Sequence, residues 1–209
     1  MLTLYAAPTC PFAQRTRALL QHLNVEFKFE AVDLEARGEE FLKLSPTGKV
    51  PLLVDGKGKL YESIVINTYL ADRHGYVQAW SEDVYVRARQ HLAMVQWDAV
   101  INRVFQRSMR KPDSFDGAAR RSLGKELDEL VDTVHAMGQT HGNLLSFHCA
   151  PFWARMDWLR ELSAAVELVD ERVHLRRWLD DALAQESIAA TLPDREETVQ
   201  RYRERYTSA

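Results

Sequence analysis

The fold is decided by the stretch Leu2-Thr3-Leu4-Tyr5-Ala6-Ala7-Pro8-Thr9-Cys10-Pro11-Phe12. Residues 2–6 are predicted to form a strand, which Pro8 ends. Pro11 suits the first position of a helix, because its φ is fixed and it has no N–H to leave unbonded. The residues that follow at helical spacing share one face: Phe12, Thr16, Leu19, Leu20 and Leu23. A strand therefore leads into a helix with a cysteine between them.

Cys10 stands where a thiol is activated. The unbonded N–H groups and the positive dipole end of a helix's first turn favour thiolate over thiol. The second cysteine of a redox pair would be residue 13, which is Ala13. A mixed disulfide on Cys10 therefore needs an external thiol to resolve it. A lone cysteine is more often a small buried residue, but the strand–Cys–Pro–helix context favours the reactive interpretation.

The rest of residues 1–75 mixes strands and helices. Alternating apolar and charged residues predict one further strand. The turn Asp55-Gly56-Lys57-Gly58 predicts that two more form a hairpin, and Ser63 suits the cap of the last helix. The predicted elements are the strands 25–31, 51–54 and 59–61 and the helices 36–44 and 63–74. The order is therefore β-α-β-α-β-β-α.

Strand-like alternation ends near residue 82, and helical periodicity replaces it. Ser81 is predicted to cap a long helix that Pro112 ends. The predicted helices are 81–110, 117–137, 144–166, 170–185 and a charged one from 194. The fold class is therefore α/β plus all-α, with domains at residues 1–75 and 83–209 and a linker at 76–82.

Two further features point to a peptide-like ligand. An extended Val50 would offer its N–H and C=O to a peptide by strand-like pairing. Pro51, which follows it, is either a cis proline that turns this backbone toward a ligand or a simple strand-opening residue. Ser63 and the start of its helix suit a carboxylate, although a capping role also explains the serine. Glu62 would pair with an ammonium group, and one end of an amino acid carries both charges.

Together these residues resemble the glutathione transferase superfamily. Cys10-Pro11-Phe12-Ala13-Gln14-Arg15 is similar to the active-site segment of the cysteine-containing omega class and its bacterial and plant relatives. Gly48-Lys49-Val50-Pro51 and Glu62-Ser63 are similar to the glutathione-binding segments. The resemblance is strong over residues 1–75. Over 83–209 it depends on helical content, length and Ala150-Pro151.

The resemblance implies a thioredoxin-like, glutathione-binding N-terminal domain and an all-helical C-terminal domain. It implies that glutathione is the co-substrate, that Cys10 is the catalytic thiol and that Pro51 is cis. The implied glutathione contacts are Phe12 and Val50 at the cysteinyl part, Glu62 and Ser63 at the γ-glutamyl end, and Arg37, assisted by Lys49, at the glycyl carboxylate. It also implies a cytoplasmic homodimer.

One position departs from the family pattern. The third helix of the C-terminal domain usually starts with a Ser/Thr-x-x-Asp capping box, and here the corresponding residues are Asn143 and Ser146. Asn143 is a good N-cap, but Ser146 is a weaker partner than aspartate for the N–H of the cap residue. We interpret this as a variant cap that bears on folding more than on function.

A cysteine at position 10 favours thiol transfer over conjugation. A hydroxyl side chain stabilises the thiolate of bound glutathione, whereas a cysteine attacks a glutathione mixed disulfide directly. The leading prediction is glutathione-dependent thiol transfer: deglutathionylation, or reduction of a small disulfide or of dehydroascorbate. The alternatives are conventional conjugation to an apolar electrophile, with Tyr5 or Thr9 as the hydroxyl, and a non-catalytic binding protein that kept the fold.

Composition limits the partners. The 209 residues carry a formal net charge of −3, whereas a nucleic-acid binder is usually basic. No apolar run is long enough to span a bilayer, no signal peptide is visible, and the seven histidines show no metal-ligand spacing. We therefore expect no nucleic acid, no membrane and no metal. Two cysteines do not make a disulfide framework, which favours a reducing compartment.

Overall fold

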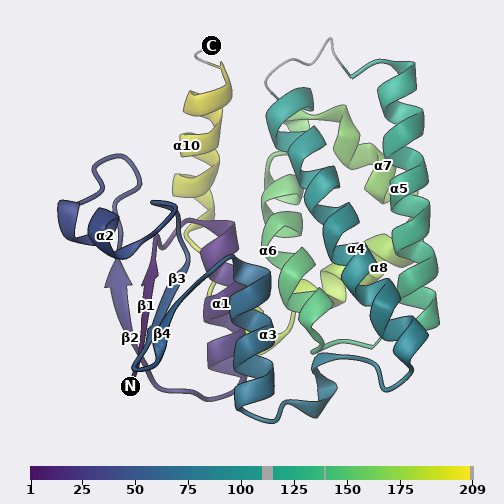
Figure 1. Ribbon diagram of the computed structural model, residues 1–209. Helices are drawn as coiled ribbons and strands as arrows, with labels where there is room; N and C mark the ends of the chain where they lie inside the picture. Colours follow the sequence, from purple (N-terminus) through teal and green to yellow (C-terminus); the bar gives the residue numbers. More distant parts are fainter. Residues whose placement is uncertain (110–114, 139, 208–209) are drawn as a thin grey trace. The chain divides into compact units, whose positions relative to one another are not determined.

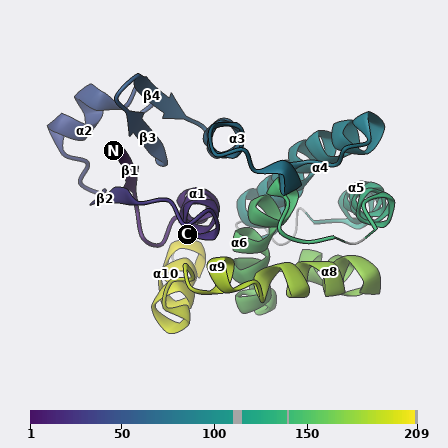
Figure 2. The same ribbon diagram turned by 90° about the horizontal axis from the view of Figure 1, so that it is seen from below.

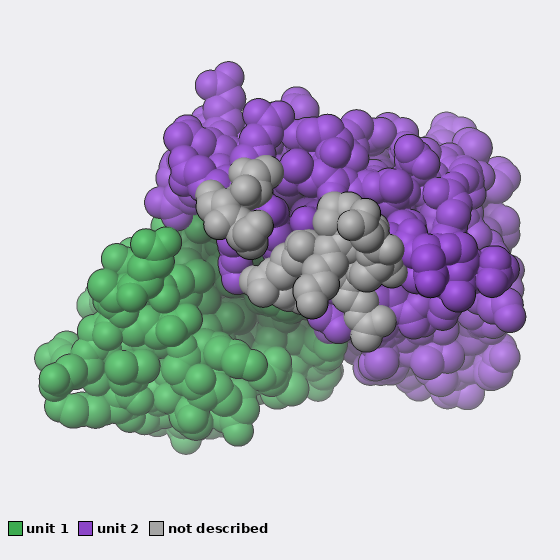
Figure 3. All heavy atoms as spheres, turned by 90° about the horizontal axis from the view of Figure 1, so that it is seen from above, with its two compact units in different colours: residues 1–79, 186–193 green, residues 80–185, 194–209 purple. Residues whose placement is uncertain are grey.

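The computed structural model describes residues 1–109, 115–138 and 140–207 (Figure 1). The chain divides into two compact units, coloured separately in Figure 3. Unit 1 comprises residues 1–79 and 186–193, and unit 2 comprises residues 80–185 and 194–209. Unit 1 is α/β and unit 2 is helical, so the predicted fold class is confirmed.

Unit 1 is built on a four-stranded sheet. Its strands are β1 Leu2–Ala6, β2 Phe27–Ala31, β3 Leu52–Asp55 and β4 Gly58–Tyr61, in the order β2-β1-β3-β4. β1 pairs with β2 in parallel and with β3 antiparallel, and β3 and β4 form the predicted hairpin. β1 therefore lies inside the sheet, and the residues that follow it, including Cys10, leave from its centre.

Helices cover both faces of this sheet. α1 (Pro11–His22) and α3 (Ser63–Arg73) pack against each other, and α2 (Glu39–Leu44) lies on the opposite face (Figures 1 and 2). Alternate residues of a strand point to opposite faces. Leu4 is accordingly fully buried, whereas Tyr5 joins a small apolar cluster with Phe41 of α2. A 3-10 turn, Val77–Ala79, ends the first part of the unit.

Residues 186–193 complete unit 1, although they follow the helices of unit 2 in the sequence. Their short helix α9 (Glu186–Ala189) packs against α1. The buried amide of Gln14 donates hydrogen bonds to the Thr191 hydroxyl at 3.3 Å and to the Ile188 carbonyl at 3.5 Å. The sequence predicts that this stretch belongs to the helical domain at residues 83–209, whereas these residues belong to unit 1.

Unit 2 is a group of helices packed around α6. Val173–Leu183 forms α8, and the central helix α6 (Leu144–Trp158) is buried from its first residue to Met156. α6 packs against α4 and α8, and α4 packs against α5. The remaining elements are α4 (Val84–Asn102), a π-helix (Arg103–Ser108), α5 (Gly117–Ala136), the 3-10 turns Arg160–Leu162 and Ala164–Val166, α7 (Glu167–Asp170) and α10 (Arg195–Thr207).

The variant cap of α6 is intact. The side-chain oxygen of Asn143 accepts a hydrogen bond from the Ser146 N–H at 3.1 Å, as predicted for an N-cap. Such a cap is typically worth about 1 kcal/mol. Ser146 also places its hydroxyl 3.4 Å from the same Asn143 oxygen.

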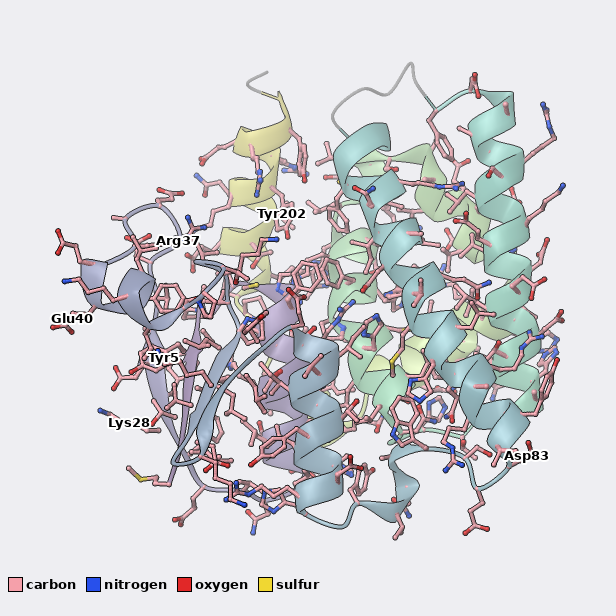
Figure 4. The ribbon with its side chains drawn as sticks, viewed as in Figure 1. Tyr5, Lys28, Arg37, Glu40, Asp83 and Tyr202 are labelled. Atoms are coloured by element: carbon pink, nitrogen blue, oxygen red, sulfur yellow. The ribbon has the colours of Figure 1, made fainter. Side chains whose placement is uncertain are left out.

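Two other predicted caps are wrong. α4 is capped by Asp83 (labelled in Figure 4), whose carboxylate accepts from the N–H groups of Tyr85 and Val86. The N–H of Ser81 instead donates to the Gln90 side chain at 2.9 Å. In α3 the N-cap position belongs to Glu62, and Ser63 is the first helical residue.

Helix lengths also differ from the predictions. α6 ends at Trp158, because the chain turns into 3-10 geometry there, whereas one helix had been predicted to reach residue 166. α4 passes into the π-helix at Arg103, and the predicted end at residue 110 lies outside the described residues. The first helix of unit 1 begins at Pro11 as predicted.

Candidate active site

Cys10 is the N-cap residue of α1. Its φ of −73° and ψ of 119° are extended, and Pro11 begins the helix. The Cys10 N–H donates to the Ala7 carbonyl at 3.1 Å, and the Cys10 carbonyl accepts from the Gln14 N–H at 2.9 Å. These bonds fix the turn between β1 and α1. The side chain of Cys10 is therefore held at the positive end of the helix dipole, where a thiolate is stabilised.

No second cysteine follows Cys10 along α1. Ala13, one turn onward, is fully buried, and the other cysteine, Cys149, is a buried residue of α6 in unit 2. Neither cysteine takes part in a disulfide. The site is therefore a monothiol site.

Arg15 joins the start of α1 to the start of α3. Its side chain is 1% exposed. Its Nη1 donates to the Ser63 hydroxyl oxygen at 3.4 Å, and its guanidinium carbon lies 4.9 Å from the centroid of the Phe12 ring. Phe12 is itself 40% exposed rather than part of the buried helix face as predicted. Two of the predicted glutathione-binding residues, Phe12 and Ser63, therefore contact the same guanidinium.

A second link lies one residue along α1. The Thr16 hydroxyl donates to the side-chain oxygen of Asn67 on α3 at 2.9 Å, and the Asn67 amide donates to the Arg15 carbonyl at 3.2 Å. All three residues are buried, so these bonds are shielded from water. They hold the two helix starts at a fixed distance from each other.

Glu62 adopts a strained backbone conformation. Its φ is +68° and its ψ is 117°, which a residue with a side chain rarely adopts. Such a conformation costs of order 1–3 kcal/mol and tends to occur where it serves a ligand or a switch. In this conformation Glu62 is the N-cap residue of α3, and its carbonyl accepts from the Ile66 N–H at 3.0 Å. Glu62 and the buried Ser63 are therefore a candidate site for the ammonium and carboxylate groups at one end of an amino acid.

The Val50–Pro51 peptide bond is cis. The loop before it is held by a hydrogen bond from the Ser45 hydroxyl to the Lys49 carbonyl at 3.3 Å and by a left-handed Gly48 at φ +63°. In the part of the chain that the structure describes, the N–H and C=O of Val50 have no hydrogen-bonding partner. These two groups are available to a bound peptide, and the pairing itself stays a prediction.

Arg37 and Lys49 are exposed cations on separate loops. Arg37 lies between β2 and α2 (labelled in Figure 4), after a turn in which the Asp33 carboxylate accepts from the Glu35 N–H at 2.8 Å. Lys49 precedes Val50, and its N–H donates to the Thr47 hydroxyl at 3.3 Å. The described residues show no contact that joins either cation to Cys10 or Ser63. Their role as carboxylate ligands stays a prediction.

Comparison with known proteins agrees with this arrangement. The family model of the glutathione S-transferase N-terminal domain matches residues 4–78. A probable glutathione transferase of Aplysia californica is 30% identical over 84 residues, which is 40% of this chain and 91% of that protein. This chain belongs to the glutathione S-transferase superfamily. The omega-1 glutathione S-transferase of Mus musculus is 27% identical over 198 residues, covering 91% of this chain and 79% of the relative.

The structural comparison extends the likeness to both units. Glutathione transferase Omega 1C from Trametes versicolor superposes with a TM-score of 0.77 at 21% identity, covering 99% of this chain and 96% of that one. At this identity the match shows the shared fold. The curated relatives to which this chain is similar include omega-class glutathione S-transferases.

The two alternative hydroxyls of this glutathione S-transferase differ in their surroundings. The Tyr5 ring packs 6.0 Å from the Phe41 ring in the cluster on the α2 face of the sheet. This supports a packing role for Tyr5. Thr9 is half-buried beside Cys10 in the β1–α1 turn.

Two findings concern other classes of site. Among residues 1–109, 115–138 and 140–207, no group of three or more His, Cys, Asp or Glu side chains is placed to hold a metal ion. None of the helices within the same ranges has the length and apolar character needed to cross a membrane.

Arg15 and Asn67 are not among the site residues predicted from the sequence. Arg15 stands four residues before Leu19, on the buried side of α1, and a charge in that pattern was the available signal. Asn67 gave no such signal, because asparagine at that position in a helix is compatible with exposure.

Proposed function

We propose that this glutathione S-transferase is a glutathione-dependent thiol transferase whose nucleophile is Cys10. The observation that carries the proposal is Cys10 at the N-cap of α1, before Pro11 and without a second cysteine at position 13. A thiolate there attacks disulfide sulfur, which a serine or tyrosine hydroxyl does not do. The omega-class relatives support a glutathione transferase-like function in general.

The proposed reaction has two exchange steps. In the first, the Cys10 thiolate attacks the glutathione sulfur of a mixed disulfide RS–SG. A Cys10–SG bond forms, the RS–SG bond breaks, and the released RS⁻ takes a proton to become RSH. In the second, the thiolate of a free glutathione attacks Cys10–SG, which forms oxidised glutathione and restores the Cys10 thiolate. The sum is RSSG + GSH → RSH + GSSG.

The binding part of the proposal assigns the glutathione molecule to residues of unit 1. The backbone of Val50 pairs with the cysteinyl residue, Phe12 lies beside it, and Glu62 accepts from the γ-glutamyl ammonium. Ser63 donates to the γ-glutamyl carboxylate. Its oxygen already accepts from Arg15, so its one hydroxyl proton remains available as a donor. Arg37 and Lys49 attract the glycyl carboxylate.

Replacing Ser63 by alanine should weaken glutathione binding. A hydrogen bond to a charged group is worth about 1.5–3 kcal/mol, so we expect kcat/KM for glutathione to fall about tenfold or more. Steady-state rates at varied glutathione concentration measure this change. Ser63→Thr keeps the hydroxyl and should keep most of the rate.

A ligand control sharpens the Ser63 prediction. Glutathione whose γ-glutamyl carboxylate is converted to an amide should lose less affinity than glutathione does when Ser63 is replaced by alanine, because its hydrogen bond from Ser63 is not charge-assisted; calorimetry measures both losses. A similar loss of affinity for this amide and for glutathione would show that Ser63 does not contact that carboxylate.

The proposal includes a homodimer. α4 has an apolar stripe at alternating spacings of three and four residues, opposite its buried face: the exposed Tyr85, Ala88, Leu92 and Val95 and the half-buried Ala99. Leu92 and Val95 are 48% and 64% exposed. This spacing is that of a helix that packs along its length against another helix. The partner that fits a self-complementary stripe is a second copy of this chain.

Charging the stripe should separate the dimer. We expect the double variant Leu92→Glu, Val95→Glu to sediment as a monomer at concentrations at which the wild type sediments as a dimer, because two carboxylates would be buried without partners. Arg87→Glu places a carboxylate on the same helix outside the stripe and should leave the dimer intact. Wild type that sediments as a monomer would contradict the proposed dimer.

A further inference from the structure

Two histidine side chains meet on the surface of unit 2. His135 lies in the last turn of α5, and His174 lies in the first turn of α8. Both residues are exposed, and their ring centroids are 5.2 Å apart at an interplanar angle of 70°. Because the two residues come from different helices, no short spacing in the sequence indicates this pair.

The separation of the two rings is that of two ligands of one tetrahedral ion. A Zn–N bond is about 2.0–2.1 Å long and a ring nitrogen lies about 1.2 Å from the centroid of its imidazole, so each centroid lies about 3.2 Å from the ion. At a tetrahedral angle of about 109°, two such centroids are about 5.2 Å apart. The observed separation is 5.2 Å, and at 70° the rings are not stacked face to face, which would turn their lone pairs away from a common point.

The nitrogens of both rings are available to an ion. In the part of the chain that the structure describes, neither side chain takes part in a hydrogen bond or an ion pair. A neutral imidazole with a lone pair to give is the commonest metal ligand in proteins. The described residues place no third His, Cys, Asp or Glu with this pair. An ion bound here therefore keeps water in its remaining positions.

The two helices are fastened together beside the pair. Arg172, at the N-cap of α8 just before His174, donates from Nη2 to the Gly124 carbonyl of α5 at 2.9 Å. Its Nε donates to the Asp128 carboxylate of α5 at 2.8 Å. Ligands held by a fixed scaffold lose little freedom when they bind, so less of the binding free energy is spent on ordering them.

The charges near the pair favour a cation. Asp132, one turn before His135 on α5, is exposed and forms no ion pair within the described residues. Arg177, one turn after His174 on α8, is paired with Asp181 at 4.0 Å. The C-terminal end of α5 attracts a cation and the N-terminal end of α8 repels one, so the two helix dipoles offset each other. The carboxylate of Asp132 then gives the surface its negative balance.

We propose that His135 and His174 together bind one Zn²⁺ ion, which links the end of α5 to the start of α8. Each ring supplies one nitrogen, and water completes the coordination. The site is separate from the proposed thiol chemistry, because Cys10 and every predicted glutathione contact belong to unit 1.

The test is a calorimetric titration of Zn²⁺ into the full chain. All proteins carry Cys10→Ser, because a thiolate at position 10 would also bind zinc. We expect one ion per chain. His135→Gln and His174→Gln should each raise the Kd at least about tenfold, because attachment at two points becomes attachment at one. The variant with both replacements should lose little more than either alone, since both rings serve the same ion.

Two further measurements serve as controls. His74→Gln removes an exposed imidazole from unit 1 and should leave the zinc affinity unchanged. An ion that binds the native state stabilises it, so Zn²⁺ should raise the urea midpoint of unit 2 in the parent chain but not in His174→Gln. Both histidines are exposed, and circular dichroism should show that their glutamine variants fold as the parent does.

Three outcomes would overturn the site. They are the absence of zinc binding in the parent chain, equal zinc affinity in the parent and both single variants, and losses that add in the double variant, which would place two ions on two separate rings. Glutathione binding, measured in parallel without Zn²⁺, should be the same in all these proteins. This separates failure of the zinc site from failure of the proposed glutathione site.

Discussion

Replacing Cys10 by serine should abolish glutathione-dependent disulfide reduction. The serine hydroxyl is not ionised near neutral pH and does not form a mixed disulfide, so we expect the rate to fall at least about a thousandfold. The measurement is reduction of the mixed disulfide of 2-hydroxyethyl disulfide and glutathione, with wild type and variant side by side. Glutathione binding by Cys10→Ser should persist, because the binding contacts come from other residues.

The second cysteine provides a matched control. Cys149→Ser removes a buried thiol from α6 in unit 2 and should keep the activity. Mass spectrometry after exposure to oxidised glutathione should find one glutathione on Cys10 of the wild type and of Cys149→Ser. Reductase activity that survives in Cys10→Ser would contradict the assignment of Cys10 as the nucleophile. Conjugation of a chloronitrobenzene without disulfide reduction in the wild type would instead place the protein among conventional transferases.

Replacing Trp153 by alanine should strongly lower the free energy of unfolding of unit 2. Trp153 is fully buried in α6, and its Nε1 donates to the Asp180 carboxylate of α8 at 2.7 Å. The Arg176 guanidinium lies 5.8 Å from its ring centroid. Truncating a buried tryptophan leaves a cavity, and we expect a loss of about 3–5 kcal/mol in the free energy of unfolding. Urea denaturation measures this.

Tryptophan fluorescence, used to follow the urea denaturation, reports on unit 2, because all five tryptophans lie within residues 80–185. Trp153→Phe keeps most of the packing and should lose only about 1–2 kcal/mol with the hydrogen bond. Trp158→Phe, at the half-buried end of α6, should have a small effect and controls for the loss of one fluorophore. Equal stability of Trp153→Ala and Trp158→Phe would show that α6 is not the centre of the unit.

The elements predicted well were those with a strong local signal. Pro11 fixed the start of α1, and Asp55-Gly56-Lys57-Gly58 fixed the β3–β4 hairpin, because both depend on backbone properties of the residues themselves. The cap of α4 was predicted wrongly because Ser81 and Asp83 have similar capping preferences and only the geometry of the chain chooses between them. The end of α6 at Trp158 could not be predicted either, because no glycine or proline follows it directly.

The site was predicted in part for a related reason. Cys10, Val50 and Ser63 each lie in a short motif that indicates its chemistry locally. The role of Arg15 depends on its hydrogen bond to Ser63, 48 residues away. A contact over that separation leaves no periodic signal in one sequence. The same holds for Thr16 and Asn67, whose hydrogen bond joins two helices that each look ordinary alone.

Residues 186–193 make unit 1 discontinuous along the chain, and this limits how the protein can be recombined. A fragment that stops before residue 186 lacks the Thr191 hydroxyl and the Ile188 carbonyl that accept from Gln14, four residues after Cys10. A chimera that exchanges residues 1–79 alone therefore pairs one parent's α1 with another parent's α9. A chimera that exchanges residues 1–79 and 186–193 together keeps all of unit 1 from one parent.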